Sequence, residues 1–259
     1  MELISPRIIP VLLMDRSRRL VKTVRFGERT YIGDPFNVVR IFNEKEVDEI
    51  CLIDIDASAD DRDPDIGFVR EFASECFMPL SYGGGLKRPQ VCETLHRVGV
   101  EKLIVGSQAP EETLVRELAA HFGSQAVVVS ADISTGQKGR EARTLNGKRK
   151  VAGNPLEFAH RMVELGAGEI LLNDIDRDGT RSGYDLELVG EFSRSLPVPV
   201  IALGGAGENH HLREGLLAGA SAVASGSAFT FQGALRAVLI TYPTPDDIKH
   251  EIIGGVRDI

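Results

Sequence analysis

Two short glycine runs are the residues in this sequence whose type and spacing best suit anion binding. Gly83, Gly84 and Gly85 follow one apolar segment, and Gly204 and Gly205 follow another in the second half of the chain. Glycine permits a tight turn in which backbone N–H groups point at an anion, and a helix that begins next adds partial positive charge. A single glycine run is more often a structural turn, so its recurrence is what favours function.

Two further apolar segments are each followed by a Gly-Ser pair, Gly106-Ser107 and Gly226-Ser227. In each pair the serine hydroxyl group stands beside a backbone N–H group that is available to a ligand. Together with the glycine runs, these pairs form two anion-binding cups, which predict a ligand with a phosphate at each end. The N-terminal cup comprises Gly83, Gly84, Gly85, Gly106 and Ser107, and the C-terminal cup comprises Gly204, Gly205, Gly226 and Ser227.

Two aspartates stand where they suit proton transfer. Asp132 ends the segment AlaValValValSerAlaAsp, where partial burial would raise its pKa and suit it to acid–base catalysis. Capping of a helix or loop is the alternative for this residue. Asp178 lies in AspIleAspArgAspGlyThr, where it acts in binding or catalysis or shapes an Asp-Gly turn. We take Asp132 and Asp178 as candidate catalytic residues.

The sequence contains an internal repeat, since LeuIleAspIleAsp at 52–56 recurs as LeuAsnAspIleAsp at 172–176. The offset is 174 − 54 = 120, close to half the chain, and the glycine runs recur at a similar offset. We therefore predict two similar half-barrels, roughly 1–122 and 123–259. At the neighbouring offset of 132 − 13 = 119, Leu13 is the counterpart of Asp132 at the end of the first predicted strand, and a leucine cannot move a proton. Asp15, two residues later, is a weak substitute because it would have to act from the loop and the basic run SerArgArg follows it.

Eight short apolar runs alternate with segments of helical period, which indicates an α/β fold. The pattern favours a closed (β/α)₈ barrel, although element order alone leaves an open doubly wound sheet possible. In such a barrel the loops after the strands gather at one end, which we call the mouth, and carry the active site. The predicted strands are 7–13, 49–54, 78–81, 102–106, 126–132, 169–173, 198–203 and 222–224, and the predicted helices include 37–46, 66–76, 111–122, 156–165 and 185–195.

A basic segment at 134–150 follows the fifth predicted strand. It contains Asn146-Gly147, a strong turn signal for a β-hairpin. The segment either folds over the mouth or forms a solvated loop.

The composition excludes several classes of function. The 259 residues carry a formal charge of −8, which argues against nucleic acid as the main partner. The six histidines show no metal-type spacing, so we expect neither a metal nor a cofactor. The cysteines Cys51, Cys76 and Cys92 are odd in number and without paired spacing, which indicates free thiols and a cytoplasmic location. None has a nucleophile context, so this chain should not hydrolyse glutamine itself. The apolar stretch 8–14 is too short for membrane insertion.

The sequence resembles the cyclase subunit of imidazole glycerol phosphate synthase along nearly its whole length. The matching motifs include ArgIleIlePro from 7, AspIleAspAlaSer from 54, GlyGlyGly from 83, AspArgAspGlyThrArgSerGlyTyrAsp from 176 and GlyGlyAlaGly from 204. The resemblance implies a barrel that takes ammonia from a class I glutaminase docked at the N-terminal ends of the strands. A bisphosphorylated ribulosyl substrate would fill both cups, with Lys22 on a mobile loop above it. The ammonia gate would be Arg7, Glu49, Lys102 and Glu169.

The family's two catalytic aspartates fall at Asp132 and at Leu13, so one is absent. The divergent branch associated with acetamidino-sugar formation in surface polysaccharide (lipopolysaccharide) synthesis resembles this chain in its LeuLeu at 12–13 and its LeuValLysThr at 20–23. That resemblance implies ammonia delivery to a third protein that amidates a nucleotide-linked N-acetyl sugar. The alternatives are an authentic cyclase and lyase of histidine biosynthesis, and a non-catalytic scaffold that activates the glutaminase. The isomerase one step earlier on the same pathway fits less well, given the gate residues.

Overall fold

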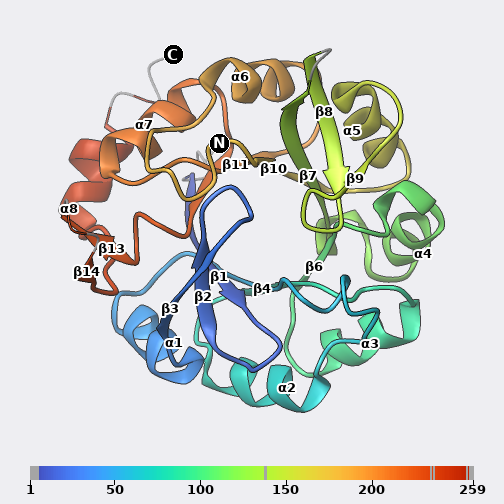
Figure 1. The fold of residues 1–259 in the computed structure, drawn as a ribbon, viewed down its shortest axis with the longest axis horizontal. Coiled ribbons are helices and arrows are strands. Elements are labelled where there is room, and N and C mark those ends of the chain that lie inside the picture. Colours follow the sequence, from blue (N-terminus) through green and yellow to red (C-terminus); the bar gives the residue numbers. More distant parts are fainter. Residues whose placement is uncertain (1–5, 137–138, 234, 236, 255, 257–259) are drawn as a thin grey trace.

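Eight parallel strands close into a barrel in the computed structural model, which describes residues 6–136, 139–233, 235, 237–254 and 256 (Figure 1). Each strand pairs with the next, and the last pairs with the first through Arg7 and Ala222. The predicted (β/α)₈ barrel is confirmed, and the open sheet is excluded. The barrel strands are β1 (Arg7–Met14), β4 (Ile50–Asp54), β5 (Leu80–Gly83), β6 (Lys102–Val105), β7 (Val127–Gly136), β10 (Glu169–Asp174), β11 (Val200–Leu203) and β12 (Ala222–Ser225).

A ring of helices surrounds the barrel, with the short elements η1 (Ala109–Glu111) and η2 (Ser124–Ala126) between them (Figure 1). Asp34 and Asn154 each cap a helix with their side chains, and a proline follows each of them. Asn and Asp at the N-cap with Pro next are favoured at helix starts. The helices are α1 (Pro35–Glu44), α2 (Ile66–Glu75), α3 (Pro89–Arg97), α4 (Thr113–Phe122), α5 (Pro155–Glu164), α6 (Leu186–Ser195), α7 (Asn209–Leu217) and α8 (Pro245–Asp247), which continues into η3 (Ile248–Ile252).

The apolar side chains form two separate cores. The larger core fills the shell between strands and helices, and it includes Phe42, Phe72 and Phe192. The smaller core fills the inside of the barrel with residues such as Ile9 and Leu171. Because side chains alternate along a strand, each barrel strand except β5 contributes to both cores, and β5 directs Ser81 toward the inside of the barrel. No helix among the described residues is long and apolar enough to cross a membrane.

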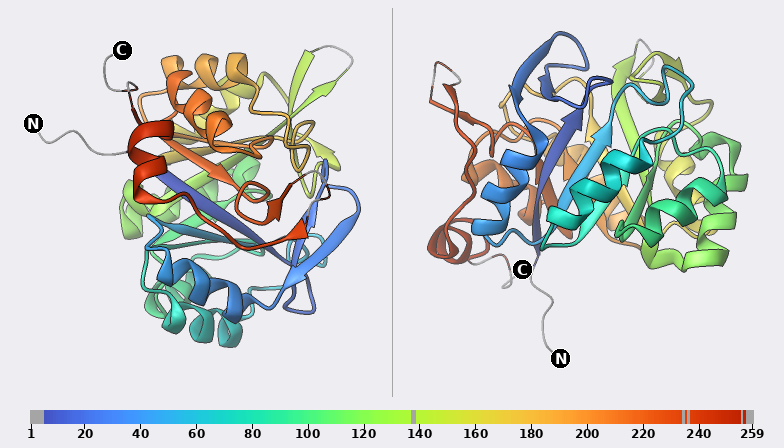
Figure 2. Two further views of the ribbon diagram at one scale, coloured as in Figure 1. Left: turned by 90° about the vertical axis from the view of Figure 1, so that its left-hand side faces the viewer. Right: turned by 90° about the horizontal axis from the view of Figure 1, so that it is seen from below.

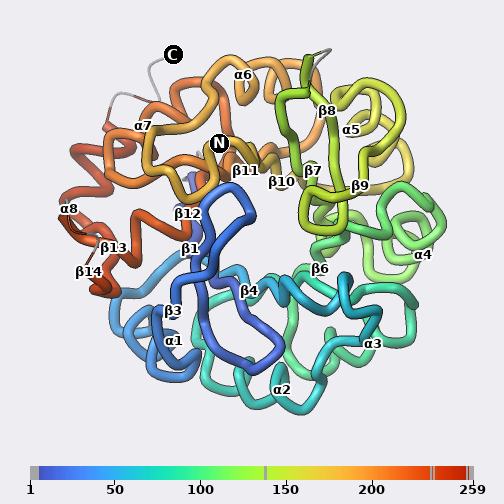
Figure 3. The backbone as a smooth tube through the Cα atoms, viewed as in Figure 1, coloured from blue at the N-terminus to red at the C-terminus, as the bar shows by residue number. Residues whose placement is uncertain are grey.

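Hairpins rise from the strand ends at the mouth (Figures 2 and 3). The first joins β2 (Leu20–Thr23) to β3 (Arg29–Gly33), the second joins β7 to β8 (Gly139–Thr144), and β8 turns into β9 (Arg149–Lys150). The Asn146-Gly147 turn was predicted, and the structure confirms it between β8 and β9. A third hairpin of β13 (Phe231–Gln232) and β14 (Ala237–Val238) follows β12. The fifth strand is longer than predicted because it continues to Gly136 as one arm of a hairpin.

Candidate functional site

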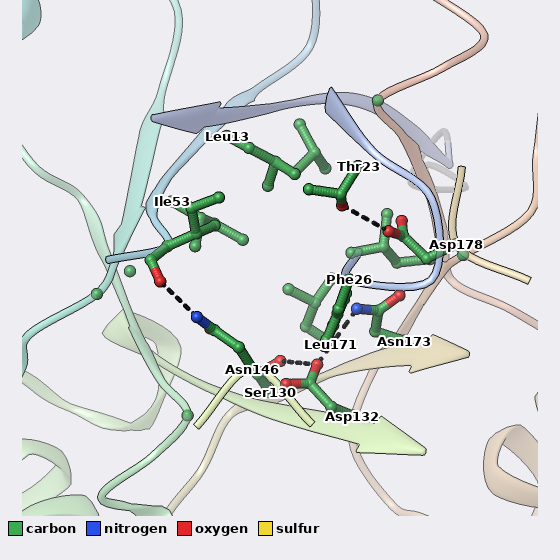
Figure 4. A pocket seen from close by; sticks show the side chains of 18 of the residues that line it. Leu13, Thr23, Phe26, Ile53, Ser130, Asp132, Asn146, Leu171, Asn173 and Asp178 are labelled. Atoms are coloured by element: carbon green, nitrogen blue, oxygen red, sulfur yellow. Dashed lines mark hydrogen bonds between the residues drawn. The ribbon is translucent and has the colours of Figure 1, made fainter. Parts of the chain in front are cut away.

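A pocket of about 150 Å³ opens at the mouth of the barrel (Figure 4). It is lined by the carboxyl ends of the strands and by residues of the hairpins, among them Phe26 and Asn146. The structure brings every residue predicted for the mouth to this one pocket. These residues are Leu13, Lys22, Gly83, Gly84, Gly85, Gly106, Ser107, Asp132, Asp178, Gly204, Gly205, Gly226 and Ser227.

Asp132 projects into the pocket from β7, where its carboxylate accepts hydrogen bonds from Ser130 Oγ at 3.0 Å and Asn173 Nδ2 at 3.3 Å. Burial raises the pKa of Asp132 to about 6, although both hydrogen bonds oppose the shift. A carboxyl group with a pKa near neutrality is suited to gain and lose a proton. Asp132 therefore has the surroundings expected of an acid–base group.

Asp178 lies on the loop after β10 and accepts a hydrogen bond from Thr23 Oγ1 at 3.2 Å. Burial raises the pKa of Asp178 to about 6, and the nearby cation of Lys22 works against that rise. The backbone carbonyl of Asp178 also accepts from the Arg25 N–H at 2.9 Å. Asp178 thus both faces the pocket and anchors the β2–β3 hairpin.

Lys22 is 5% exposed, and its Nζ donates a hydrogen bond to the carbonyl oxygen of Val11. Burial lowers the pKa of Lys22 to about 8, with partial compensation from Asp178. A Cβ atom added to Gly226 would lie only 2.0 Å from this Nζ. The lysine therefore reaches into the barrel against the C-terminal cup.

The side of the pocket across from Asp132 is apolar. Leu13 and Ile53 lie there in Figure 4, and Ile53 is the repeat counterpart of Asn173 (173 − 53 = 120). Asp15, which the sequence offered as a substitute for Leu13, accepts hydrogen bonds from the backbone N–H groups of Ser17 and Arg19 and does not line the pocket. Asp54 at the end of β4 also lines the pocket, but its carboxylate accepts hydrogen bonds from the Ala57 N–H at 3.0 Å and from Arg62 at 2.6 Å.

The two cups share a backbone geometry that requires glycine. Gly84 and Gly204 have φ values of 110° and 91°, and an added Cβ would lie 2.3 Å from the Asp54 carbonyl oxygen and 2.4 Å from that of Asp174. Gly84 and Gly204 are therefore equivalent positions in the two halves, 204 − 84 = 120 residues apart. The paired glycines are therefore required for packing whether or not a phosphate binds.

The four predicted gate residues form a ring of alternating charge at the opposite end of the barrel. Arg7 Nη1 lies 2.5 Å from Glu49 Oε2, and its Nη2 lies 2.9 Å from Glu169 Oε1. Lys102 Nζ lies 2.9 Å from Glu49 Oε2 and 3.1 Å from Glu169 Oε1. Ser81 Oγ also donates to Glu49. Each carboxylate contacts both cations, so the ring closes this end without net charge.

A small cavity of about 10 Å³ lies between the ring and the mouth pocket. Glu49 of the ring and Ser81 are among its lining residues, and it shares Val11, Ile104 and Leu171 with the mouth pocket. Its volume suits about one molecule of the size of water. The barrel thus contains an apolar chamber between two polar ends.

Some lining residues were not predicted from the sequence, namely Phe26, Ser130, Asn146 and Asn173 in the pocket. The internal repeat could have pointed to Asn173, because the equivalent residue in the first half is the apolar Ile53 and a polar residue at such a position is unexpected. No group of three or more His, Cys, Asp or Glu side chains is arranged to hold a metal within the part of the chain that the structure describes.

Comparison with known proteins identifies the family. The pattern of the histidine biosynthesis protein family matches residues 7–236. A Pseudomonas aeruginosa protein named "Putative imidazole glycerol phosphate synthase subunit hisF2" is 47% identical over 244 residues, which cover 93% of this chain and 97% of the relative. A Leptospira borgpetersenii protein with a similar name is 43% identical and covers 95% and 98%. The imidazole glycerol phosphate synthase subunit HisF of Streptomyces avermitilis is 41% identical and covers 90% and 93%. The chain therefore belongs to the histidine biosynthesis protein family and is HisF-like.

Proposed function

We propose that this HisF-like barrel receives ammonia from a separate class I glutaminase and delivers it through the barrel to a third protein. The ring of Arg7, Glu49, Lys102 and Glu169 is the entrance, and the apolar chamber above it is the path. Neutral ammonia is close to water in size, so the chamber of about 10 Å³ suits one molecule. The third protein uses the ammonia to convert a nucleotide-linked N-acetyl sugar to an acetamidino sugar.

The observation that carries this proposal is Leu13 in the pocket across from Asp132. Ring formation with carbon–nitrogen ligation and cleavage needs proton transfer on more than one side of the substrate. Leu13 and Ile53 provide no such group, whereas the entrance ring is complete. The retained entrance and the missing acid–base partner together favour delivery over cyclisation.

Names of relatives also support a branch apart from the histidine-pathway enzyme. The Pseudomonas aeruginosa and Vibrio vulnificus relatives carry the numbered names hisF2 and hisF3. Such numbers suit genomes that hold more than one copy, and a further copy is free to serve a different acceptor.

An authentic cyclase and lyase of histidine biosynthesis is the second candidate. Lys22 favours it, since a buried amine with a pKa of about 8 is a proton-transfer group that Leu13 is not. A non-catalytic scaffold that only activates the glutaminase is a third possibility, and it requires no ammonia path.

The deciding assay follows imidazole glycerol phosphate from the purified barrel with ammonium salt and the ribulosyl bisphosphate of the histidine pathway. We expect no turnover by the natural protein. The Leu13→Asp variant restores the carboxylate, and Leu13→Asn is its matched control of equal size without a proton to exchange. Full turnover by the natural protein would establish the histidine-pathway cyclase and overturn delivery to a third protein.

A glutaminase assay separates delivery from a scaffold. With the cognate glutaminase bound and glutamine as the nitrogen source, we expect ammonia to appear at the acceptor in preference to bulk solvent. An Ile104→Trp change, which fills the chamber, should abolish that preference but leave glutamine hydrolysis intact. Unchanged transfer in this variant would contradict a path through the barrel.

A further inference from the structure

Strand β10 contributes a side chain to each level of the barrel interior. Glu169 belongs to the ring, Leu171 lines the chamber and Asn173 lines the mouth pocket, because alternate residues of a strand face the same side. On the neighbouring strand β7, Val128 lines the chamber and Asp132 lines the pocket. A small molecule that leaves the chamber along these two strands therefore passes from apolar walls to the side chains of Asn173 and Asp132.

The side chain of Asn173 carries a buried acceptor without a partner. Asn173 is 6% exposed and its Nδ2 donates to Asp132 Oδ1, but its Oδ1 makes no hydrogen bond to any described residue. An added Cβ at Gly204 would lie 2.9 Å from this Oδ1, so the oxygen points toward the loop after β11, which also lines the pocket. Figure 4 shows Asn173 between Asp132 and Asp178. A buried acceptor of this kind calls for a donor from a ligand.

The other charged side chains that line the pocket each face an opposite charge. These pairs are Lys22 with Asp178, Arg29 with Asp56, and Asp54 with Arg62. The carboxylate of Asp132 has no such balance, because its partners in the described ranges are the neutral side chains of Ser130 and Asn173.

The strand next to Asp132 does not provide a cation for it either. Arg143 lies opposite Asp132 in the pairing of β7 with β8, but its guanidinium donates to Ser134 and Glu141. A pKa of about 6 leaves the Asp132 carboxylate mostly ionised at pH 7. An unbalanced negative charge and a free acceptor thus lie side by side in the mouth, where a small cation with hydrogen-bond donors would satisfy both.

We propose that Asp132 and Asn173 form a binding site for ammonium, which is made there from ammonia that leaves the chamber. The proton of the Asp132 carboxyl group passes to the ammonia nitrogen, so that an O–H bond breaks and an N–H bond forms. The resulting ion donates to the Asp132 carboxylate and to Asn173 Oδ1. On release the proton returns to Asp132, and neutral ammonia departs. This inference rests on the proposed function for the source of the ammonia.

The site gives the path a direction. Ammonium is charged, and the chamber is lined by apolar side chains such as Val128 and Leu171. Burying an unpaired charge among such groups is costly, so nitrogen held as ammonium at the mouth does not return toward the ring. The nitrogen therefore stays at the mouth until an acceptor takes neutral ammonia from it.

The first test is a pH titration of the aspartate carboxyl groups of the intact barrel by carbon NMR, with Asp132→Asn to identify the signal. Ammonium chloride is compared with tetramethylammonium chloride at equal ionic strength. Because ammonium binds the ionised carboxylate, about 0.1 M should lower the pKa of Asp132 by about 1, which corresponds to a Kd of about 10 mM. An Asp132 pKa that is the same in both salts would overturn the proposal.

A pair of variants then tests the part played by Asn173. Asn173→Leu removes the free acceptor and should weaken ammonium binding at least tenfold, because a hydrogen bond to a charged group is worth about 1.5–3 kcal/mol and 1.4 kcal/mol corresponds to tenfold. Ser58→Ala removes a hydroxyl group from the β4 side of the same pocket and should stay within about twofold. The thermal midpoint reports whether each variant folds, and Asn173→Ala is a second, smaller replacement. Equal affinities in the Asn173 and Ser58 variants contradict the proposal.

The last comparison uses potassium, which has the same charge as ammonium but no hydrogen-bond donor. Ammonium should bind at least tenfold more tightly, and equal affinities would show a general cation site instead. These titrations use the barrel without glutaminase or acceptor. Absent ammonium binding would refute this site and leave delivery standing, whereas intact binding with no transfer to an acceptor would count against the proposed function.

Discussion

Replacing Lys102 with methionine tests whether the entrance ring is held together as a balanced set of charges. The 2.9 and 3.1 Å contacts of Lys102 to Glu49 and Glu169 each provide about 5–6 kcal/mol of gross Coulomb attraction at an effective dielectric constant near 20. Desolvation offsets most of this, and removing one partner of a buried pair typically costs about 3–5 kcal/mol. The Lys102 side chain is 17% exposed, so we expect the lower end, about 3 kcal/mol of unfolding free energy.

The cost should depend on pH through Glu49. Burial raises the pKa of Glu49, but Lys102, Ser81 and Arg7 outweigh burial and hold the pKa below its ordinary value of 4.5. A lowered pKa contributes stability above the unfolded value that is lost as pH falls through the folded value. In Lys102→Met, Glu49 loses one of these charges and takes a proton more readily. The difference in unfolding free energy between the natural protein and Lys102→Met is therefore largest at pH 7 and becomes smaller as pH falls below about 4.5.

Urea unfolding at pH 7 and pH 4, followed by circular dichroism, measures both effects. The exposed Lys148→Met is the matched control and should change stability by less than about 0.5 kcal/mol. The double variant Lys102→Met with Glu169→Gln removes one charge of each sign and should recover about 1–2 kcal/mol. The reasoning is refuted if the single variant loses less than about 1 kcal/mol at pH 7, if the loss is equal at pH 4, or if the double variant is no more stable.

Three further changes test the mouth. Burial raises the pKa of Asp132 from 3.8 to about 6, so the free energy of unfolding falls as pH rises between these two values. Asp132→Asn should therefore stabilise the protein by about 1–3 kcal/mol at pH 7 but by little below pH 4, as measured by urea unfolding. Gly204→Ala should cost more than about 2 kcal/mol, whereas Gly106→Ala, whose Cβ has 3.8 Å of clearance, should cost less than about 1; equal thermal midpoints would contradict this. Arg29→Met removes both bonds to buried Asp56, so amides of the β2–β3 hairpin should exchange hydrogen at least tenfold faster, with no change in β10.

The barrel could be predicted from the sequence because its strands are short apolar runs whose spacing admits few arrangements. The ring also followed from the sequence, since the resemblance placed charges at the starts of four strands and the closed sheet brings those starts together. Helix starts were marked locally by capping residues such as Asp34 and Asn154. Local signals of this kind do not depend on the rest of the fold.

The β2–β3 hairpin could not be predicted in this way. Its strands contain polar residues, and it is fixed by distant contacts, such as Arg29 to Asp56 and the Arg25 N–H to the Asp178 carbonyl. The turn also places Arg25 and Phe26 at φ values of 53° and 57°. Positive φ values in turns are usually marked in a sequence by glycine or asparagine, and neither residue stands at these two positions. Phe26 therefore reached the pocket without a signal in its own segment.

The two halves of the barrel differ where the backbone allows them to differ. Gly84 and Gly204 are held by carbonyl contacts of the same kind, so the repeat persists at those positions whatever the mouth binds. Side chains that face the pocket have no such constraint, and three matched pairs are more polar in the second half: Leu13 with Asp132 at an offset of 119, and Ile53 with Asn173 and Ser58 with Asp178 at an offset of 120. All three changes put acid–base and hydrogen-bonding groups on one side of the mouth. A symmetric scaffold with chemistry on one side suits a molecule that enters through the centre and leaves unchanged better than a substrate that must be protonated from both sides.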